Sequence, residues 1–334
     1  MQRYPWTHWP ADPTPPADAF RIGVLYENAS WIELLREELD RRALPYDAID
    51  LTSHDYELAP PTDATLYFNR VSPSSHLRGH DAAVPLARTW MQLLESYGTR
   101  VINGSRSFHL ETSKVAQLLL LRQLGVRTPR TWVFNDRRCL KKLRDFPFPA
   151  ILKPDTGGSG AGVRKVHSYD ELVEVMQSEE DLFGPDHLLL LQEYIDHDAI
   201  VRTEFVDTDL VYATRVVATN TFNLCPADGC ERSPAGDGPP PSVQFVPYPE
   251  IPRDAVAQAR EVVRAAGLDV GGVEYVETAE GERVFFDINA TSVYRSDVSE
   301  AFGIEGFVTL VDFLEREFHK ENAKRRGSTR GLAV

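Results

Sequence analysis

A glycine-rich segment between Ile151 and Val163 constrains the fold of this chain more than any other stretch. An apolar, strand-like run ends at Lys153 and Pro154, glycines follow at positions 157, 158, 160 and 162, and a strand-like pattern then resumes. Glycines allow positive φ angles and leave backbone N–H groups open, which suits a loop that folds over an anion. A lysine just before such a loop is placed to reach a phosphate oxygen. The alternative is a flexible hairpin beside a solvated lysine, and the segment alone does not decide between the two.

Two well-known phosphate-binding loops do not match this segment. No Gly-Lys-Ser/Thr triplet ends it, so the hydroxyl that holds Mg²⁺ in a P-loop is missing. A dinucleotide-binding loop opens a helix after its last glycine, whereas here the strand-like Val163–Val166 comes first. The next helix is predicted to begin near Ser168, because Ser168-Tyr-Asp-Glu171 matches a capping box. Strand, glycine loop, strand and helix in this order predict a lid over a nucleotide, not a cradle beneath one.

The predicted elements alternate as in an α/β chain. Strands are expected at 21–26, 48–51, 64–68 and 101–102, with helices at 31–42 and 82–97 between them, which predicts a mostly parallel N-terminal sheet. Further along, the pattern predicts a helix at 111–124, a strand at 188–195, hairpins at 200–218 and 270–289, and helices at 253–266 and 306–320. Residues 219–249 carry no regular pattern and are expected to form a long, mobile cover over the substrate.

A chain of 334 residues can bury a large core in two or three units. The expected organisation is a Pro-rich extension (1–19), an N-terminal α/β domain (20–105), a central subdomain with the glycine loop (106–196), a C-terminal subdomain (197–322) and a disordered tail (323–334).

Charge and composition exclude some partners. The chain has 36 Lys and Arg against 50 Asp and Glu, a net charge of -14, which argues against a nucleic acid or an anionic membrane as its main partner. No apolar run approaches the roughly 20 residues of a membrane-spanning helix. The N-terminal residues lack the plan of a signal peptide, and three cysteines do not form a disulfide framework. A cytoplasmic location is therefore expected.

Two predicted strands near the C-terminus carry oxygen-bearing side chains. Glu274 lies in the first, and Asp287 and Asn289 lie in the second. Residues two apart in a strand share a face, and antiparallel pairing would let Glu274 face the other two. Two carboxylates and an amide oxygen are hard ligands suited to Mg²⁺ that also binds nucleotide phosphates. In isolation, an ordinary solvated sheet face with acidic residues is the more frequent origin of such a cluster.

Together and in this order, these features resemble the ATP-grasp superfamily, and within it the branch of ribosomal-protein glutamate ligases and related amino-acid ligases. The resemblance covers about residues 21–320. The family's first nucleotide lysine matches Lys114 near the start of a helix, the pattern Gly-Val-x-x-Pro-x-Thr follows at Gly125–Thr131, and the second lysine matches Lys153. The other site residues that the resemblance implies are the phosphate loop (Gly157, Gly158, Ser159, Gly160), the adenine contacts (Gln192, Glu193, Tyr194, Ile195), a catalytic Arg215 and the metal ligands Glu274, Asp287 and Asn289.

This resemblance implies an α/β fold of the α+β ATP-grasp type, in which an N-terminal α/β domain precedes two α+β subdomains that sandwich ATP. The implied activity is an ATP-dependent ligase that joins a carboxylate to an amine, either an amino acid or a small peptide, through an acyl phosphate, with Mg²⁺ or Mn²⁺. One alternative is a phosphotransferase on the same fold. Another is a nucleotide-binding regulator without turnover, against which the intact lysines and metal ligands argue. The oligomeric state stays open, a homo-oligomer included.

Departures from the family leave the substrate open. Many relatives place Asp and then Glu-x-Asn at the metal, whereas this chain has Glu274 and then Asp287-x-Asn289, a swap that keeps the charge. After Asn289 the usual small-residue turn is replaced by Ala-Thr-Ser-Val-Tyr-Arg-Ser-Asp297. Three arginines are candidates for substrate contacts, with a local turn or a surface ion pair as the alternative: Arg70, Arg202 and Arg295. Cys225 and Cys230 look like half of a zinc site without a second pair, and are expected to be incidental.

Overall fold

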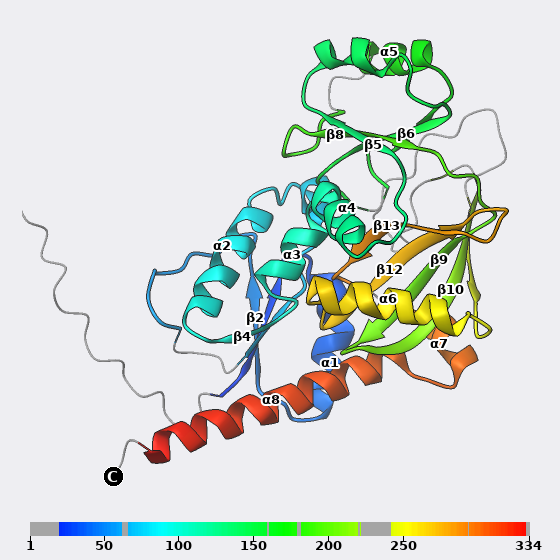
Figure 1. The fold of residues 1–334 in the computed structure, drawn as a ribbon. Helices are drawn as coiled ribbons and strands as arrows, with labels where there is room; N and C mark the ends of the chain where they lie inside the picture. Colours follow the sequence, from blue (N-terminus) through cyan, green and yellow to red (C-terminus); the bar gives the residue numbers. More distant parts are fainter. Residues whose placement is uncertain are drawn as a thin grey trace, which may run out of the picture.

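Three β-sheets form the frame of the protein (Figure 1). The structure, a computed structural model, describes residues 20–61, 66–158, 160–178, 182–219, 221, 242–292 and 294–331. One sheet is parallel and belongs to the N-terminal part, and the other two are antiparallel. This arrangement confirms the predicted fold class, an α/β domain followed by two α+β subdomains. Ser159, most of the segment 219–249 and both cysteines of the Cys225–Cys230 pair lie outside the described residues.

The N-terminal sheet has the strand order β2-β1-β3-β4. Its strands are β1 (Ile22–Tyr26), β2 (Tyr46–Asp50), β3 (Leu66–Asn69) and β4 (Arg100–Ile102), close to the predicted ranges. The helices between them are α1 (Glu33–Arg41), which continues the 3-10 turn η1 (Ala29–Ile32), and α2 (Ala83–Ser96). A second 3-10 helix, η2 (Pro73–Arg78), follows β3 at the carboxyl edge of the sheet, where α/β sheets usually present ligand contacts.

The central sheet carries the glycine segment and has the order β5-β8-β6-β7. Its strands are β5 (Thr131–Phe134), β6 (Ala150–Pro154), β7 (Arg164–Val166) and β8 (Leu189–Glu193), and it is covered by η3 (Arg137–Leu143) and α5 (Tyr169–Ser178). The α5 start has the predicted capping contacts: the Glu171 N–H donates to the Ser168 hydroxyl (3.1 Å), and the Glu171 carboxylate accepts from the His167 N–H (2.7 Å).

The C-terminal sheet has the order β11-β10-β9-β12-β13. Its strands are β9 (Ile200–Val206), β10 (Asp209–Thr219), β11 (Ser242–Pro247), β12 (Val270–Glu277) and β13 (Arg283–Asn289). Figure 1 shows helix α6 (Arg253–Ala266) lying across one face of this sheet, and its buried alanines and valines pack there. The opposite face is therefore left for the site.

Three element predictions need correction. The helix expected at 111–124 is two helices, α3 (Ser105–Glu111) and α4 (Lys114–Gln123), because the Ser113 side chain caps α4 and interrupts the helical run. Residues 242–247, expected to be irregular, form strand β11 on the edge beside β10. The closing helix α8 spans Gly306–Gly331, so residues 323–331, expected to belong to a disordered tail, are helical. Most residues from 321 to 326 (Glu, Ala, Lys and two Arg) are good helix formers, and an ion pair between Glu321 and Lys324 supports the turn.

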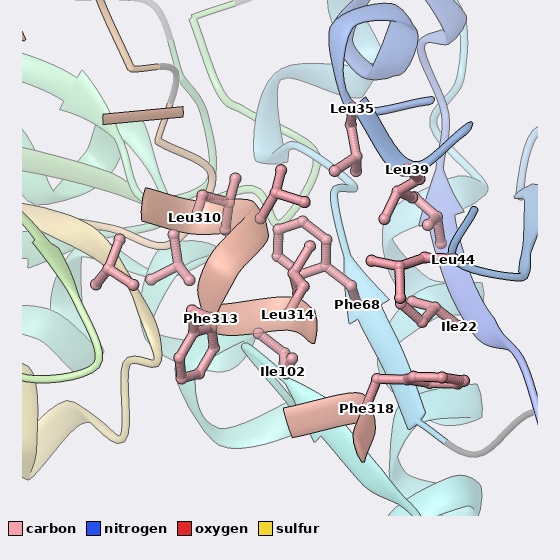
Figure 2. Close-up of a cluster of buried hydrophobic side chains, with 14 of the residues drawn as sticks. Ile22, Leu35, Leu39, Leu44, Phe68, Ile102, Leu310, Phe313, Leu314 and Phe318 are labelled. Atoms are coloured by element: carbon pink, nitrogen blue, oxygen red, sulfur yellow. The ribbon is translucent and has the colours of Figure 1, made fainter. Parts of the chain in front are cut away.

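Helix α8 joins the C-terminal part of the chain to the N-terminal sheet (Figure 2). Its apolar side chains Leu310, Phe313, Leu314 and Phe318 pack in one cluster with residues of β1, β3, β4 and α1, among them Ile22, Leu39, Phe68 and Ile102. In Figure 1 the helix runs along the base of the molecule, from the C-terminal sheet to beneath the N-terminal domain. This shared core fixes the two parts against each other and so sets the width of the space between them.

Candidate active site

A cleft of about 1480 Å³ lies between the three sheets. Pockets for one drug-sized ligand are about 300–1,000 Å³, so this cleft has room for a nucleotide and a second molecule. The predicted site residues that line it come from all parts of the chain: Arg70, Lys114, Lys153, Gly157, Gly158, Gly160, Gln192, Glu193, Tyr194, Ile195, Arg202, Glu274, Asp287, Asn289 and Arg295. Of the predicted residues that the structure describes, Arg215 is not among those that line the cleft.

Neighbouring strands of the C-terminal sheet align polar side chains in rows across its cleft face. Asp287 on β13 lies opposite Glu274 on β12, Glu274 lies opposite Arg202 on β9, and Arg202 lies opposite Thr214 on β10. Directly opposed residues in an antiparallel sheet point to the same side. The first row therefore presents two carboxylates and a guanidinium to the cleft, in the pairing that the sequence predicts for Glu274 and Asp287.

A second row runs beside the first and depends on a glycine. Asn289 lies opposite Gly272, and Gly272 lies opposite Glu204, which is itself opposite Tyr212. A Cβ atom at Gly272 would lie 2.9 Å from the Glu204 carboxylate, too close for any side chain. The missing side chain lets the buried Glu204 lie over the strand, where it accepts a hydrogen bond from the Ser292 hydroxyl.

The side chain of Glu274 is held by hydrogen bonds from Arg202 and Asn289. The Arg202 guanidinium donates to Glu274 (3.0 Å) and to Glu204, and the Asn289 Nδ2 donates to Glu274 (3.3 Å). Burial raises the pKa of Glu274 to about 7, while the charge of Arg202 opposes this shift. For Arg202, burial opposes the charge, but Glu204 and Glu274 outweigh it and raise the pKa.

The side-chain oxygens of Glu274, Asp287 and Asn289 are suited to binding a divalent cation. Because Asn289 uses its Nδ2 toward Glu274, its Oδ1 is left to face a cation with the two carboxylates. Within the ranges that the structure describes, no three His, Cys, Asp or Glu side chains group as a metal site, so the amide oxygen would be needed to complete this one. Hard oxygen ligands of this kind suit Mg²⁺ or Mn²⁺.

Lys114 reaches this row from the N-terminal side. It is the first residue of α4, whose start is held by Asp155: the Val115 N–H donates to the Asp155 carboxylate (2.7 Å) and the Lys114 N–H to its carbonyl (3.3 Å). The Lys114 ammonium forms an ion pair with Asp287. The hydrogen bonds at the start of α4 therefore fix the backbone of Lys114, and the ion pair with Asp287 fixes its ammonium group.

Lys153 brings a buried cation to the cleft. Its side chain projects from β6 and is 8% exposed. Among the described residues, no side chain forms a hydrogen bond or ion pair with its ammonium, and the nearest ring, that of Phe286, is 5.9 Å away. Burial, and then the charge of Lys114, lower the pKa of Lys153 to about 8. A buried charge needs a partner, so this lysine fits an anion in the cleft.

The glycine segment closes the cleft beside Lys153. Gly160 and Gly162 have φ angles of 72° and 70°, where a side chain would be strained. A Cβ atom at Gly158 would lie 3.1 Å from the Ser74 Cβ, so this segment passes close to η2 of the N-terminal domain. Glycine at these positions permits both the turn and the close approach.

The predicted adenine strand forms the far wall. Gln192 is buried and donates to the Thr131 hydroxyl (3.0 Å), while Glu193 accepts from the Arg130 N–H (3.0 Å). Lys165 lies over the Tyr194 ring, 3.4 Å from its centre. The side chains of Gln192 and Glu193 therefore help to hold the strand, which leaves its backbone and the side chains of Tyr194 and Ile195 to line the cleft.

Arg215 lies on the other face of its strand. Thr214, Val216 and Ala218 line the cleft, and because side chains alternate along a strand, Arg215 points away from it. Its guanidinium stacks on the Tyr248 ring, 4.3 Å from the centre, and contacts Glu277 at 3.4 Å. The structure thus does not bring this residue to the predicted catalytic position.

Arg70 and Arg295 both line the cleft but differ in how many bonds they make within the protein. Arg70 is buried and donates to the Ser292 carbonyl (3.1 Å). Arg295 forms a two-pronged ion pair with Asp297 and stacks on Phe245, 4.2 Å from the ring centre. Arg295 is thus already satisfied by the protein, whereas Arg70 keeps donors for a ligand.

Two further buried carboxylates in the cleft, Glu204 and Glu111, were not predicted. Glu204 could have been found from the sequence, because it is two residues from Arg202 in a predicted strand and shares its face. Glu111, at the end of α3, carries no such signal. Its Oε1 accepts hydrogen bonds from the Ala290 and Thr291 N–H groups (3.1 and 2.9 Å). Burial raises the pKa of Glu111 to about 7, against the effect of the hydrogen bond from the Thr291 side chain.

The part of the chain that the structure describes contains no helix long and apolar enough to span a bilayer.

Comparisons with known proteins agree with this arrangement. No protein-family model matches the chain. It is 21% identical over 299 residues to the probable alpha-L-glutamate ligase 1 of Shewanella frigidimarina, covering 84% of this chain and 93% of that protein. The RimK domain protein ATP-grasp from Sphaerobacter thermophilus superposes with a TM-score of 0.63 at 21% identity, over 88% of this chain and 98% of the other. The ATP-grasp ligase PsnB, complexed with a phosphomimetic variant of its minimal precursor, Mg and ADP, superposes with a TM-score of 0.61 at 17% identity, over 90% and 98%.

Proposed function

We propose that this chain, which belongs to the ATP-grasp superfamily, is an ATP-dependent ligase that forms an amide bond between a carboxylate and the amine of an amino acid or small peptide. The observation that carries the proposal is the arrangement around Lys153. A buried, unpaired cation lies beside a glycine segment and shares a cleft with Lys114 and a set of oxygen donors. Cations on one side and metal ligands on the other are what a nucleotide polyphosphate requires.

Each group has a definite part in binding. Lys153 and the backbone of Gly157, Gly158 and Gly160 would hold the phosphates, and Tyr194 and Ile195, which follow the strand β8, would hold the base. Glu274, Asp287 and Asn289 would hold Mg²⁺, which when bound supplies positive charge to the phosphates of ATP. Lys114 neutralises the charge of Asp287 and so reduces the repulsion between this carboxylate and Glu274.

The chemistry has two steps. An oxygen of the substrate carboxylate attacks the γ-phosphorus, the bond from this phosphorus to the bridging oxygen breaks, and ADP leaves with that oxygen. The amine nitrogen then attacks the carbonyl carbon of the acyl phosphate, a C–N bond forms, and the C–O bond to phosphate breaks, while the protons of the ammonium pass to the phosphate and to solvent. The side chains of the cleft position the reactants and stabilise the transferring phosphoryl group by charge.

Two features argue against the alternatives of a kinase and a regulator. The relatives that match most of the chain carry ligase names, the probable alpha-L-glutamate ligase among them. The volume of the cleft exceeds what a nucleotide alone would need, which argues against a regulator that binds only a nucleotide, although a kinase would need the same room.

Hydroxylamine trapping tests this proposal. Acyl phosphates react with hydroxylamine to give hydroxamates, whereas stable phosphate esters do not. With ATP, Mg²⁺, hydroxylamine and a panel of amino acids and other small carboxylates, we expect a hydroxamate from at least one acid, with ADP and phosphate in equal amounts. The Lys153→Ala variant, with its fold checked by circular dichroism, should give none. A phosphorylated product that persists in the presence of amines would identify a kinase, and nucleotide binding without ADP release from any acid would identify a regulator.

A further inference from the structure

Two buried side chains of opposite charge line the N-terminal side of the cleft without pairing to each other. Arg70 is 6% exposed and Glu111 is 3% exposed. Arg70 makes one hydrogen bond, to the Ser292 carbonyl, and the Oε2 of Glu111 has no hydrogen-bond partner. Among the described residues, neither has an ion-pair partner. Burial lowers the pKa of Arg70, and the charge of Glu111 opposes this shift, so each charge influences the other. Unpaired buried charges are costly, which points to a ligand that supplies both counter-charges.

The positions of Glu111 and Arg70 along the cleft can be read from the segment 290–292, which follows the proposed metal ligand Asn289 and which both residues contact. Glu111 holds Ala290 and Thr291, which follow Asn289 directly, and Arg70 holds the carbonyl of Ser292, one residue further on. Glu111 therefore lies nearer the metal ligands and Arg70 lies farther from them along this segment. A ligand bridging the two would place its positive end toward the reacting groups and its negative end away from them.

An apolar compartment adjoins this pair. Its walls are Trp31, Leu34, Phe245, Ile304 and Phe307, and most of these pack on the cluster that contains Leu35, Phe68 and Leu310 (Figure 2). The Arg70 guanidinium lies over the Phe68 ring, 5.6 Å from its centre, and Phe68 belongs to the same apolar cluster on which the compartment packs. Burying this apolar surface against an apolar group of a ligand removes both from water and so favours binding.

The charged residues at the edge of the compartment disfavour an acidic ligand group. Glu300 and Glu305 are exposed and line this end of the cleft, while the positive charge of Arg295 is already paired with Asp297. A carboxylate side chain placed here would face two like charges, and Arg295, the cation beside them, is already paired with Asp297.

From these contacts we propose that the amine substrate is a free α-amino acid with a large apolar side chain. Its ammonium binds the Oε2 of Glu111, its carboxylate binds the guanidinium of Arg70, and its side chain fills the compartment of Trp31, Leu34 and Phe307. This inference rests on the proposed ligase function, and it names the class of one of the two substrates. Both charged contacts form in buried surroundings, where they are stronger than at a surface.

Calorimetric titration tests the charged contacts without turnover. The probes are L-leucine, 4-methylpentanoate, which lacks the ammonium, and 3-methylbutylamine, which lacks the carboxylate, each added in the presence of a non-hydrolysable ATP analogue and Mg²⁺. We expect L-leucine to bind and each analogue to bind at least about tenfold more weakly, because a charge-assisted hydrogen bond contributes a factor of this size or more.

Variants separate direct recognition from support of the segment 290–292. Glu111→Gln should weaken L-leucine about tenfold but leave 4-methylpentanoate unchanged, because this analogue has no ammonium to lose. Arg70→Gln should weaken L-leucine and leave 3-methylbutylamine unchanged. If each variant weakened all three probes equally, the residues would hold the fold of the site and would not contact the ligand, and the proposal would be wrong.

The apolar compartment has a matched pair of variants. Leu34 and Leu58 are similarly exposed, at 67% and 69%, but only Leu34 lines the cleft. Leu34→Asp should weaken L-leucine and L-phenylalanine about tenfold and glycine little, while Leu58→Asp should change none of them. Tighter binding of L-glutamate than of L-leucine would overturn the inference. If a carboxylate gives a hydroxamate but no apolar amino acid binds, the ligase proposal survives and only this inference fails.

Discussion

Lys114 and Asp287 form an ion pair across the cleft between the start of α4 and the strand β13. One residue belongs to a helix that follows the N-terminal domain, and the other belongs to the last strand of the C-terminal sheet. The pair therefore ties two parts of the chain together at the point where the phosphates and the metal are proposed to bind. It also compensates the charge of a carboxylate that lies directly opposite Glu274.

Replacing this carboxylate should stop the reaction. Asp287→Asn keeps the shape of the side chain but removes a charged metal ligand, so we expect ADP release to fall about 100-fold or more at millimolar Mg²⁺. Steady-state assays measure the loss, and circular dichroism checks the fold. The control is Asp254→Asn, which removes an exposed carboxylate that pairs with Arg283 outside the cleft, and it should keep its activity. Full activity in Asp287→Asn would mean that the metal is bound elsewhere.

Nucleotide affinity should depend on pH through Lys153. Its pKa is lowered to about 8, so in the free protein it loses its charge as the pH rises above this value. Bound phosphate favours the charged form, so the affinity for a non-hydrolysable ATP analogue should fall about tenfold between pH 8 and pH 9.5. Lys153→Arg keeps its charge in this range and should show a flat profile by calorimetry. Parallel profiles for the two proteins would show that the titrating group is a different one.

Glu111 should make the protein less stable at high pH than at mildly acidic pH. Its pKa is raised from 4.5 to about 7, so the fold favours the protonated form and the ionised form costs stability above pH 7. Glu111→Gln cannot ionise but keeps an oxygen for Ala290 and Thr291. We expect this variant to exceed the wild type by about 2–3 kcal/mol in free energy of unfolding at pH 8, and the gain should shrink as the pH falls from 7 toward 4.5. Urea unfolding at pH 8 and pH 5.5 measures both differences, and a gain that grows on acidification would contradict this prediction.

Asn103 should be one of the most sensitive positions for stability. It is fully buried, its Oδ1 accepts from the Asp269 and Val270 N–H groups (3.0 and 3.1 Å), and its Nδ2 donates to the Val270 carbonyl (2.6 Å). These bonds join the end of β4 to the start of β12. Asn103→Ala should lower the free energy of unfolding by about 3–5 kcal/mol, because it leaves buried polar groups unpaired.

The backbone at Asn103 provides an internal control. Its φ is 51°, a region that glycine adopts freely and alanine does not. Asn103→Gly should therefore be about 1 kcal/mol more stable than Asn103→Ala, although both lose the side-chain bonds. Equal stabilities in denaturant unfolding would show that the left-handed backbone carries no cost here.

Much of the fold could be predicted because its signals are local. Alternation along the chain and capping residues predict β1, α2, α6 and β13 to within a residue or two. The pairing of Glu274 with Asp287 followed from two adjacent strands of period two. Where local signals were weak, the prediction was wrong: β11 is an edge strand whose residues alternate in burial, and the Pro- and Gly-rich sequence before it hid the pattern.

The sequence by itself determined the elements and the residue types of the site, since the glycine segment, the lysines and the oxygen donors are each readable from short windows of the chain. Only the tertiary structure decided which of them face one another. The face of β10 that reaches the cleft is set by its register with β9, and this register turns Arg215 away and Thr214 inward. Glu111 enters the site because α3 packs against the segment after Asn289, some 180 residues later in the chain. Such contacts depend on how separate elements pack and bury their charges, and no window of sequence contains both partners.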